Sequence, residues 1–166
     1  MAIDGPRATF VSLLAVSIVV IVATRNLLGA LSVLTVLALG VTWLVGGAAW
    51  SGEKFNYVNF ITLPITFGIG CEYPFNVYDR SRLMRGDVTA GLLRGGGAVA
   101  LCSYTTIVGY SSMLFADFQA LKSFGRLAVS GECACLTGAL LILPALLHAV
   151  AGKRTNAAAT QLLSRR

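Results

Sequence analysis

Five long apolar segments, joined by short connections, constrain how this chain of 166 residues can fold. A helix needs about 20 mostly apolar residues to cross the hydrocarbon core of a bilayer. The segments are Ala8 to Thr24, Leu27 to Trp50, Tyr57 to Tyr78, Gly95 to Ala116 and Phe124 to Ala151. Because 56% of the residues are hydrophobic and only 12% are charged, the sequence predicts an all-α integral membrane protein with five transmembrane helices.

The basic residues predict how these helices cross the membrane. Placing the C-terminus in the cytoplasm puts nine of the thirteen lysines and arginines inside, where loops are enriched in these residues. The nine are Arg25, Arg80, Arg82, Arg85, Arg94, Lys153, Arg154, Arg165 and Arg166. The N-terminus is then outside, and a membrane segment of residues 1–151 is followed by a basic cytoplasmic tail, residues 152–166. An odd number of helices that begins outside suggests the C-terminal part of a longer protein.

Several other functions are not expected. The net charge of +6 does not indicate a nucleic-acid partner, because the basic residues are scattered in loops around membrane spans. The connections leave no room for a soluble catalytic domain, so neither an enzyme nor a cofactor is predicted. The cysteines Cys71, Cys102, Cys133 and Cys135 lie in predicted spans and form no disulfide framework. Cys133 and Cys135 point to different helix faces, which argues against a metal site.

Glu72 carries the clearest functional prediction, because it lies inside the third apolar segment. An ionisable group at that depth is costly unless it has a partner, so a proton relay, an ion site or a substrate counter-charge is favoured over a structural carboxylate. Asn76 and Asp79 follow at intervals of four and three residues and share its face, which we expect to turn toward other helices. A carboxyl group that alternates between neutral and ionised forms is what a proton carrier needs.

The third segment also contains helix-breaking residues. Pro64 and Pro74 each remove a backbone donor and are expected to free the carbonyl groups of Phe60 and Gly70. In transporters such interruptions often mark a binding site, and an ordinary proline kink is the alternative. Pro144 is expected to bend the last span near its inner end.

The fourth segment is rich in glycine and hydroxyl residues, among them Thr105, Thr106 and Ser112. Such residues allow helices to pack closely, and most of their hydroxyls bond to their own helix backbone. One or two are nevertheless expected to face Glu72, which needs a partner. In the last segment, Glu132 either belongs to the same relay or bonds to a neighbouring helix, and the second role is favoured.

The connection between the third and fourth segments has an amphipathic pattern. Met84, Val88 and Leu92 recur at four-residue spacing, with arginines around them. This pattern predicts a short interfacial helix on the inner leaflet.

Several sequence blocks occur in the same order as in a known family. The blocks Asn59 to Pro64, Gly68 to Tyr73, Val77 to Arg80, Thr105 to Ser112 and Leu143 to Leu147 resemble the C-terminal membrane half of the MMPL family. That family belongs to the resistance-nodulation-division (RND) superfamily of proton-driven exporters. The similarity extends over about residues 4 to 151, and the Gly-Ile-Gly and Thr-Thr-Ile blocks together are its most specific part.

The resemblance implies the eighth to twelfth helices of a twelve-helix RND-type transporter. In that family the tenth helix usually carries Asp-Tyr, which pairs with a similar motif on the fourth helix, and the matching positions here are Glu72 and Tyr73. It implies that Glu72 loads and releases the proton, that Tyr73 hydrogen-bonds the opposing carboxylate, and that Thr105 and Thr106 line the relay. Glutamate keeps the carboxylate of the usual aspartate but adds one methylene group.

The expected function is therefore the membrane segment of an exporter driven by the proton-motive force, acting on lipids or other hydrophobic compounds in a bacterial inner membrane. Asn76, Asp79 and Glu132 are expected to be accessory polar residues. The expected partners are membrane lipids, the N-terminal half of the transporter and a second copy of the chain. The alternatives are a non-transporting, sterol-sensing-like module for lipid binding or assembly, and an inactive truncated fragment.

Overall fold

The computed structural model describes residues 4–53, 60–84 and 86–150, and all regular elements in these ranges are helical. The long helices are α1 (Asp4–Thr24), α2 (Leu27–Trp50), α4 (Thr62–Leu83), α5 (Val88–Ser112) and α6 (Gln119–Thr137). The short 3₁₀ helix η1 (Met113–Phe115) follows α5, and the π-helical turn η2 (Gly138–Ile142) follows α6 before the chain returns to α-helix over residues 143–150. The predicted basic tail and the first residues of the third apolar segment, 57–59, lie outside the described residues.

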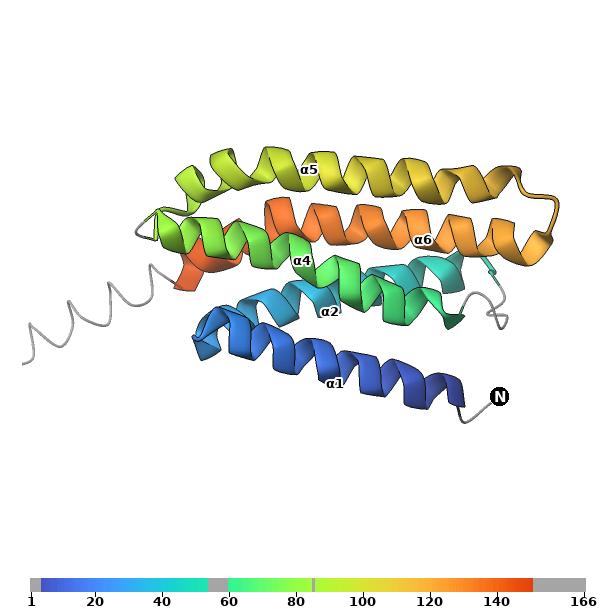
Figure 1. The fold of residues 1–166 in the computed structure, drawn as a ribbon, viewed down its shortest axis with the longest axis horizontal. Helices are drawn as coiled ribbons and strands as arrows, with labels where there is room; N and C mark the ends of the chain where they lie inside the picture. Colours follow the sequence, from blue (N-terminus) through green and yellow to red (C-terminus); the bar gives the residue numbers. More distant parts are fainter. Residues whose placement is uncertain (1–3, 54–59, 85, 151–166) are drawn as a thin grey trace, which may run out of the picture.

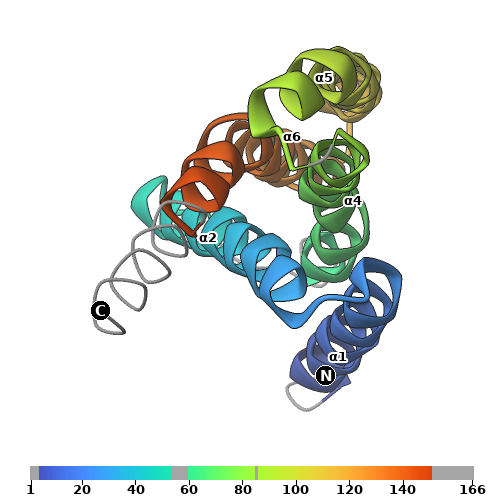
Figure 2. The ribbon, with the colours of Figure 1, turned by 90° about the vertical axis from the view of Figure 1, so that its left-hand side faces the viewer.

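The long helices form a bundle in which each runs antiparallel to the one before it (Figure 1). In the end view, α2, α4 and α6 enclose the interior, whereas α1 and α5 lie on either side of α4 (Figure 2). As a result α4 contacts all four of the other long helices. The interior consists mainly of small and branched side chains around Tyr73, among them Val33, Val36, Val77 and Leu143.

Among the described residues, four helices are long and apolar enough to cross a membrane: Gly5–Thr24, Leu27–Trp50, Val88–Phe115 and Gln119–Val150. The all-α membrane fold is therefore confirmed, and these spans overlap four of the five predicted segments, although three begin earlier than predicted, at Gly5 instead of Ala8, at Val88 instead of Gly95 and at Gln119 instead of Phe124. The remaining segment corresponds to α4, which has a similar length but carries Glu72 and, toward its end, Asp79, Arg80 and Arg82.

Local sequence explains the tight helix ends. The turn between α1 and α2 needs only two residues, because Arg25 adopts a positive φ of 48° and the Asn26 side chain accepts a hydrogen bond from the Leu28 backbone N–H. After α2, Gly52 takes a φ of 66°, and the Glu53 N–H donates to the Ala48 carbonyl oxygen. This is the usual C-terminal cap of a helix that ends before a glycine.

The structure corrects the predicted interfacial helix. In the described residues α4 continues as far as Leu83, and α5 begins at Val88, so no separate helix lies between them. Gly86 makes the turn with a φ of 85°, and the Asp87 side chain accepts a hydrogen bond from Ala90 N–H. An aspartate N-cap starts a helix effectively, and the sequence Gly-Asp at this point was the signal that the amphipathic pattern obscured.

Pro64, Pro74 and Pro144 have different consequences for the helices that contain them. Pro64 lies in the first turn of α4, which begins at Thr62 after the turn residue Ile61, and because proline has no N–H it offers the Phe60 carbonyl oxygen no donor, as predicted. Pro74 does lie inside α4, and it leaves the Gly70 carbonyl without its usual partner. Pro144 lies two residues beyond the last residue of the π-helical turn η2, so the last span is irregular near the predicted place.

Candidate functional site

A buried pair of polar residues joins α4 to α6. The Tyr73 hydroxyl donates a hydrogen bond to Glu132 Oε1, and the two residues are only 1% and 5% exposed. Tyr73 belongs to the apolar core, which contains buried residues from α1, α2, α4, α5 and α6. Glu132 thus bonds to a neighbouring helix, and Tyr73 is the partner that the sequence did not identify.

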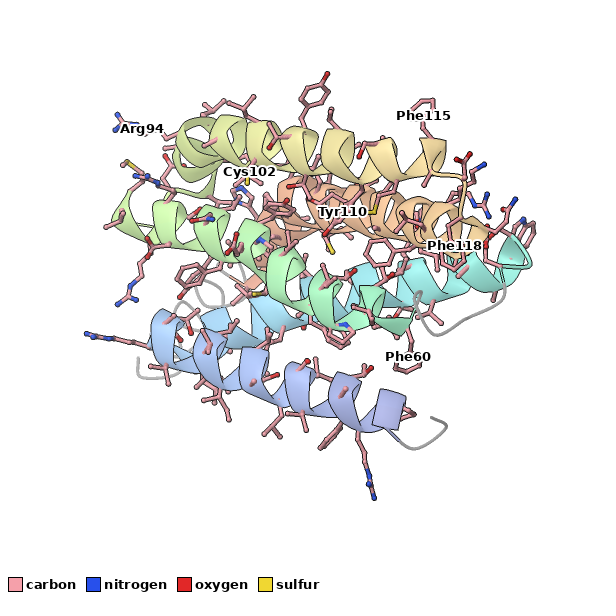
Figure 3. The ribbon with its side chains drawn as sticks, turned by 45° about the vertical axis from the view of Figure 1, so that its right-hand side comes forward. Phe60, Arg94, Cys102, Tyr110, Phe115 and Phe118 are labelled. Carbon is pink, nitrogen blue, oxygen red and sulfur yellow. The ribbon has the colours of Figure 1, made fainter. Side chains whose placement is uncertain are left out.

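Hydroxyl groups of α5 complete the surroundings of this pair. Ser103 and Thr106 lie close to the Tyr73 hydroxyl, and Ser103 also lies close to Glu132. Ser103 is fully buried, yet its oxygen has no hydrogen-bond partner among the described residues. Tyr110, labelled in Figure 3, stacks edge-on against Phe124 of α6 at 6.0 Å between ring centroids. The buried pair is therefore enclosed by α4, α5 and α6.

Glu72, by contrast, points away from the bundle interior. Its side chain is exposed, and no hydrogen bond or ion pair reaches it from the described residues. It lines a cavity of about 340 Å³ between α1 and α4, together with Val16, Val19 and Phe75. Glu72 is the eleventh of the 22 residues of α4, so the carboxylate lies halfway along this helix.

Glu72 belongs to a stripe of exposed small and polar residues on α4, with Gly68 and Asn76 at four-residue spacing. The predicted shared face of Glu72 and Asn76 is thus found, although it faces outward. Asp79 is half-buried.

A second stripe continues this surface on α5. It begins at Gly91 and Gly95, which contact Ser81 and Arg80 of α4. The α5 residues that follow at the same three- and four-residue spacing are exposed. We call the two exposed stripes together the outer face; its members are Gly68, Glu72 and Asn76 of α4 and Ala98, Cys102, Thr105, Gly109 and Ser112 of α5.

The hydroxyls expected to partner Glu72 do not do so. Thr105 Oγ1 and Thr106 Oγ1 donate to the Cys102 carbonyl oxygen at 2.8 and 3.0 Å. Such bonds to the helix backbone were the alternative reading of these residues. Thr105 lies on the same outer face as Glu72, whereas Thr106 is half-buried near Tyr73. The relay residues implied by the resemblance therefore divide between the outer face and the interior.

Within the described ranges, no three histidine, cysteine or acidic side chains lie close enough together to hold a metal ion. The described cysteines are all free thiols, and Cys135 packs against Gly70, where a methyl group would come within 2.6 Å of its sulfur. This contact brings α4 and α6 close together near the buried pair.

Comparison with known proteins gives one informative similarity. The chain is 23% identical over 146 residues to "Putative membrane protein MJ1562" of Methanocaldococcus jannaschii, and the match covers 84% of this chain. It covers 38% of that protein, so the chain spans less than two fifths of the length of this relative. No family model and no solved structure matches. The helices and this similarity together support a location in a membrane.

Proposed function

We propose that the chain is the C-terminal membrane segment of a proton-driven exporter of lipids or other hydrophobic compounds, similar to the MMPL family of the RND superfamily. The observation that carries the proposal is the position of Glu72: a carboxylate halfway along α4, on the outside of the bundle and without a partner in the described residues. A carboxylate in direct contact with hydrocarbon is too costly to persist. The outer face must therefore meet further protein or water.

The residues around Glu72 favour further protein. Small residues allow the backbones of membrane helices to approach closely, and the α5 stripe contains alanine, glycine, serine and threonine at regular spacing. In the proposal, the N-terminal half of the transporter packs here and brings its own polar residues to Glu72. That the relative is much longer than this chain is consistent with additional helices.

The proposal includes α4 as a fifth span. Its 22 residues give a length of about 33 Å at 1.5 Å per residue, which matches a hydrocarbon core of about 30 Å. Arg80 and Arg82 lie in its last turn, where long basic side chains can extend to the membrane surface. Five crossings with this arginine-rich end inside give an external N-terminus and a cytoplasmic C-terminus, in a bacterial inner membrane.

In this mechanism Glu72 accepts a proton on one side of the membrane and releases it on the other. Thr105 lies on the outer face, where in this proposal the N-terminal half of the transporter packs. Tyr73 and Glu132 fix the rotation of α4, because their hydrogen bond links α4 to α6 directly behind Glu72. Thr106 lies beside this bond and can support the Tyr73 hydroxyl.

Efflux from cells or proteoliposomes that contain the longer parent protein tests this function. Under an imposed pH gradient, Glu72→Gln is expected to abolish efflux, because an amide cannot exchange a proton near neutral pH. Glu72→Asp is expected to retain part of the activity. Asp117→Asn is the matched control, since Asp117 is an exposed acid in the turn before α6, and it is expected to behave as wild type.

The rates are compared at equal amounts of inserted protein. Wild-type efflux from the Glu72→Gln variant would contradict the relay. Absence of gradient-driven efflux from the wild type with any lipid or hydrophobic compound tested would instead favour the non-transporting lipid-binding or assembly module.

A further inference from the structure

The arginine-rich end of the bundle contains a cavity that is separate from the outer face and from the buried pair. Its volume is about 260 Å³, and it lies where the α1–α2 turn, the end of α4, the start of α5 and the end of the last span meet. Figure 2 views the bundle from this end. The lining residues are Asn26, Leu28, Gly29, Ser32, Tyr78, Ser81, Arg82, Gly86, Val88, Leu147 and Val150. We call this cavity the Arg82 pocket.

Arg82 provides a positive charge that no carboxylate of the described residues pairs with. Its Nη1 donates a hydrogen bond of 2.9 Å to the Thr24 carbonyl oxygen at the end of α1, which accounts for one of the five N–H donors of a guanidinium group. No acidic residue lines the pocket, and among the described residues no carboxylate forms an ion pair with Arg82. Donors and charge therefore remain for an anionic ligand.

Tyr78 adds a neutral donor to the same pocket. Its phenol ring packs so closely over Gly29 that any side chain at that position would overlap it. The ring is thus fixed while its hydroxyl has no hydrogen-bond partner among the described residues. The other hydroxyls are already used within their helices, because Ser32 donates to Leu28 and Ser81 donates to Val77.

The remaining wall of the pocket is apolar. Leu28, Val88, Leu147 and Val150 line it, and each lies in one of the helices that can cross the membrane. Because the pocket lies where these spans end, its polar part is at the level of lipid headgroups and its apolar part borders the hydrocarbon. Basic pockets at this level between membrane helices bind anionic headgroups.

We propose that the Arg82 pocket binds an anionic phospholipid, with the phosphate at Arg82 and Tyr78 and the upper acyl chain against the apolar wall. A guanidinium group suits a phosphate because it can donate two parallel hydrogen bonds. The apolar wall distinguishes a phospholipid from free phosphate, which would gain nothing from contact with Leu147 or Val150. The bound lipid joins four helix ends and thereby holds this end of the bundle together.

Native mass spectrometry of the purified chain tests the proposal. The chain is exchanged into detergent with equal amounts of phosphatidylglycerol and phosphatidylcholine that carry the same acyl chains, and the bound lipids are counted. We expect preferential retention of phosphatidylglycerol, and Arg82→Gln should lower that preference about fivefold, the contribution of one arginine near an anionic surface. Arg94→Gln is the control, because Arg94 lies outside the pocket lining and projects away from the bundle (Figure 3).

Two further variants separate lipid binding from folding. Arg82→Lys keeps the charge and one donor for Thr24 and should retain most of the preference. Ser32→Leu leaves Arg82 intact but fills the pocket, and it should lower the preference as Arg82→Gln does. Excess inorganic phosphate should not displace the lipid.

Equal retention of the two lipids by the wild type would overturn the proposal. So would equal losses in the Arg82→Gln and Arg94→Gln variants, since they would indicate general attraction to a basic surface. Displacement by inorganic phosphate would assign the pocket to a soluble anion instead. None of these outcomes depends on Glu72 or on transport, so this test is independent of the proposed function.

Discussion

At the scale of single residues, the hydrogen bond between Tyr73 and Glu132 joins two buried polar side chains of neighbouring helices. Both side chains are almost completely buried, so neither can use water or lipid as a substitute partner. Removing one partner therefore leaves the other as an unsatisfied buried polar group. The free-energy cost of such a group is larger than the net stabilisation that the hydrogen bond itself provides.

We predict that Tyr73→Phe destabilises the chain by about 1–3 kcal/mol, because Glu132 loses its donor. In a double-mutant cycle with Glu132→Leu, the two changes should be less than additive by about 1 kcal/mol, a typical coupling for a hydrogen bond between membrane helices. Unfolding by denaturing detergent measures these differences. Tyr104→Phe is the control, since Tyr104 is 65% exposed, and it should change little. Strict additivity would contradict a direct bond.

The sequence identified the polar residues within the spans, but it did not predict the directions in which their side chains point. Glu72 and Tyr73 are neighbours, and a rotation of α4 by about 100° per residue decides which of them faces the interior. An apolar segment with prolines and glycines on several sides does not define that rotation. Glu132 was recognisable as a helix-to-helix contact, but its partner depends on the distance between α4 and α6, which the chain sequence does not specify.

At the scale of helices, close packing of α4 and α5 depends on a glycine. A Cβ atom at Gly91 would lie 2.5 Å from the Ser81 Cα atom, so the two helix backbones touch here. Nothing lies within 4 Å of a Cβ atom at Gly97 on the same helix. These two positions offer a matched pair for measuring what the contact contributes.

We predict that Gly91→Ala destabilises the bundle by about 1–3 kcal/mol, since the added methyl group forces α4 and α5 apart. Gly97→Ala should be neutral or stabilising by up to about 1 kcal/mol, because alanine restricts the unfolded chain without a clash. Thermal unfolding in detergent compares the two variants. If both behave alike, the backbone contact at Gly91 does not exist.

The opposite end of the bundle has a contact that depends on pH. Glu53 accepts a hydrogen bond of 2.7 Å from Ser123 and lies 2.6 Å from the Arg126 guanidinium group, which together link the end of α2 to α6. The hydrogen bonds from Ser123 and Arg126 hold the pKa of Glu53 below its ordinary value of 4.5. This carboxyl group lies outside the membrane spans, in the turn after α2.

Because the pKa is lowered by folding, the ionised Glu53 stabilises the fold above its ordinary pKa, and this contribution disappears as the pH falls through the lowered value. We therefore predict that Glu53→Gln is less stable than wild type at neutral pH and that the difference vanishes as the pH drops well below 4.5. Unfolding at a series of pH values measures this, with Asp117→Asn as the control. A difference that is independent of pH would rule out a role for the charge.

At the scale of the whole molecule, the apolar segments predicted the bundle well. The lengths of the segments and their short connections were sufficient to predict a helical bundle. In a membrane the backbone N–H and C=O groups must be hydrogen-bonded within the protein, and helices achieve this within each apolar segment. The missed features are the Asp87 helix start, the first-turn position of Pro64 and the outward direction of Glu72. The first two had local signals, whereas the third depends on packing.

The claim on which the proposed function rests is that further protein covers the outer face in the longer exporter that we propose as the parent of this chain. Thr105 and Tyr104 test it directly, because they are neighbours at nearly equal depth on α5 and both are exposed. About 100° separates them around the helix axis. A nitroxide spin label at each position reports contact with lipid through its collisions with dissolved oxygen.

In bilayers that contain the parent protein, we predict that a label at position 105 collides with oxygen far less often than one at position 104. In the isolated chain the two labels should be similarly accessible, because nothing covers the outer face there. Equal and high oxygen accessibility at both positions of the parent would contradict the account, since Glu72 would then lie on a surface that faces lipid.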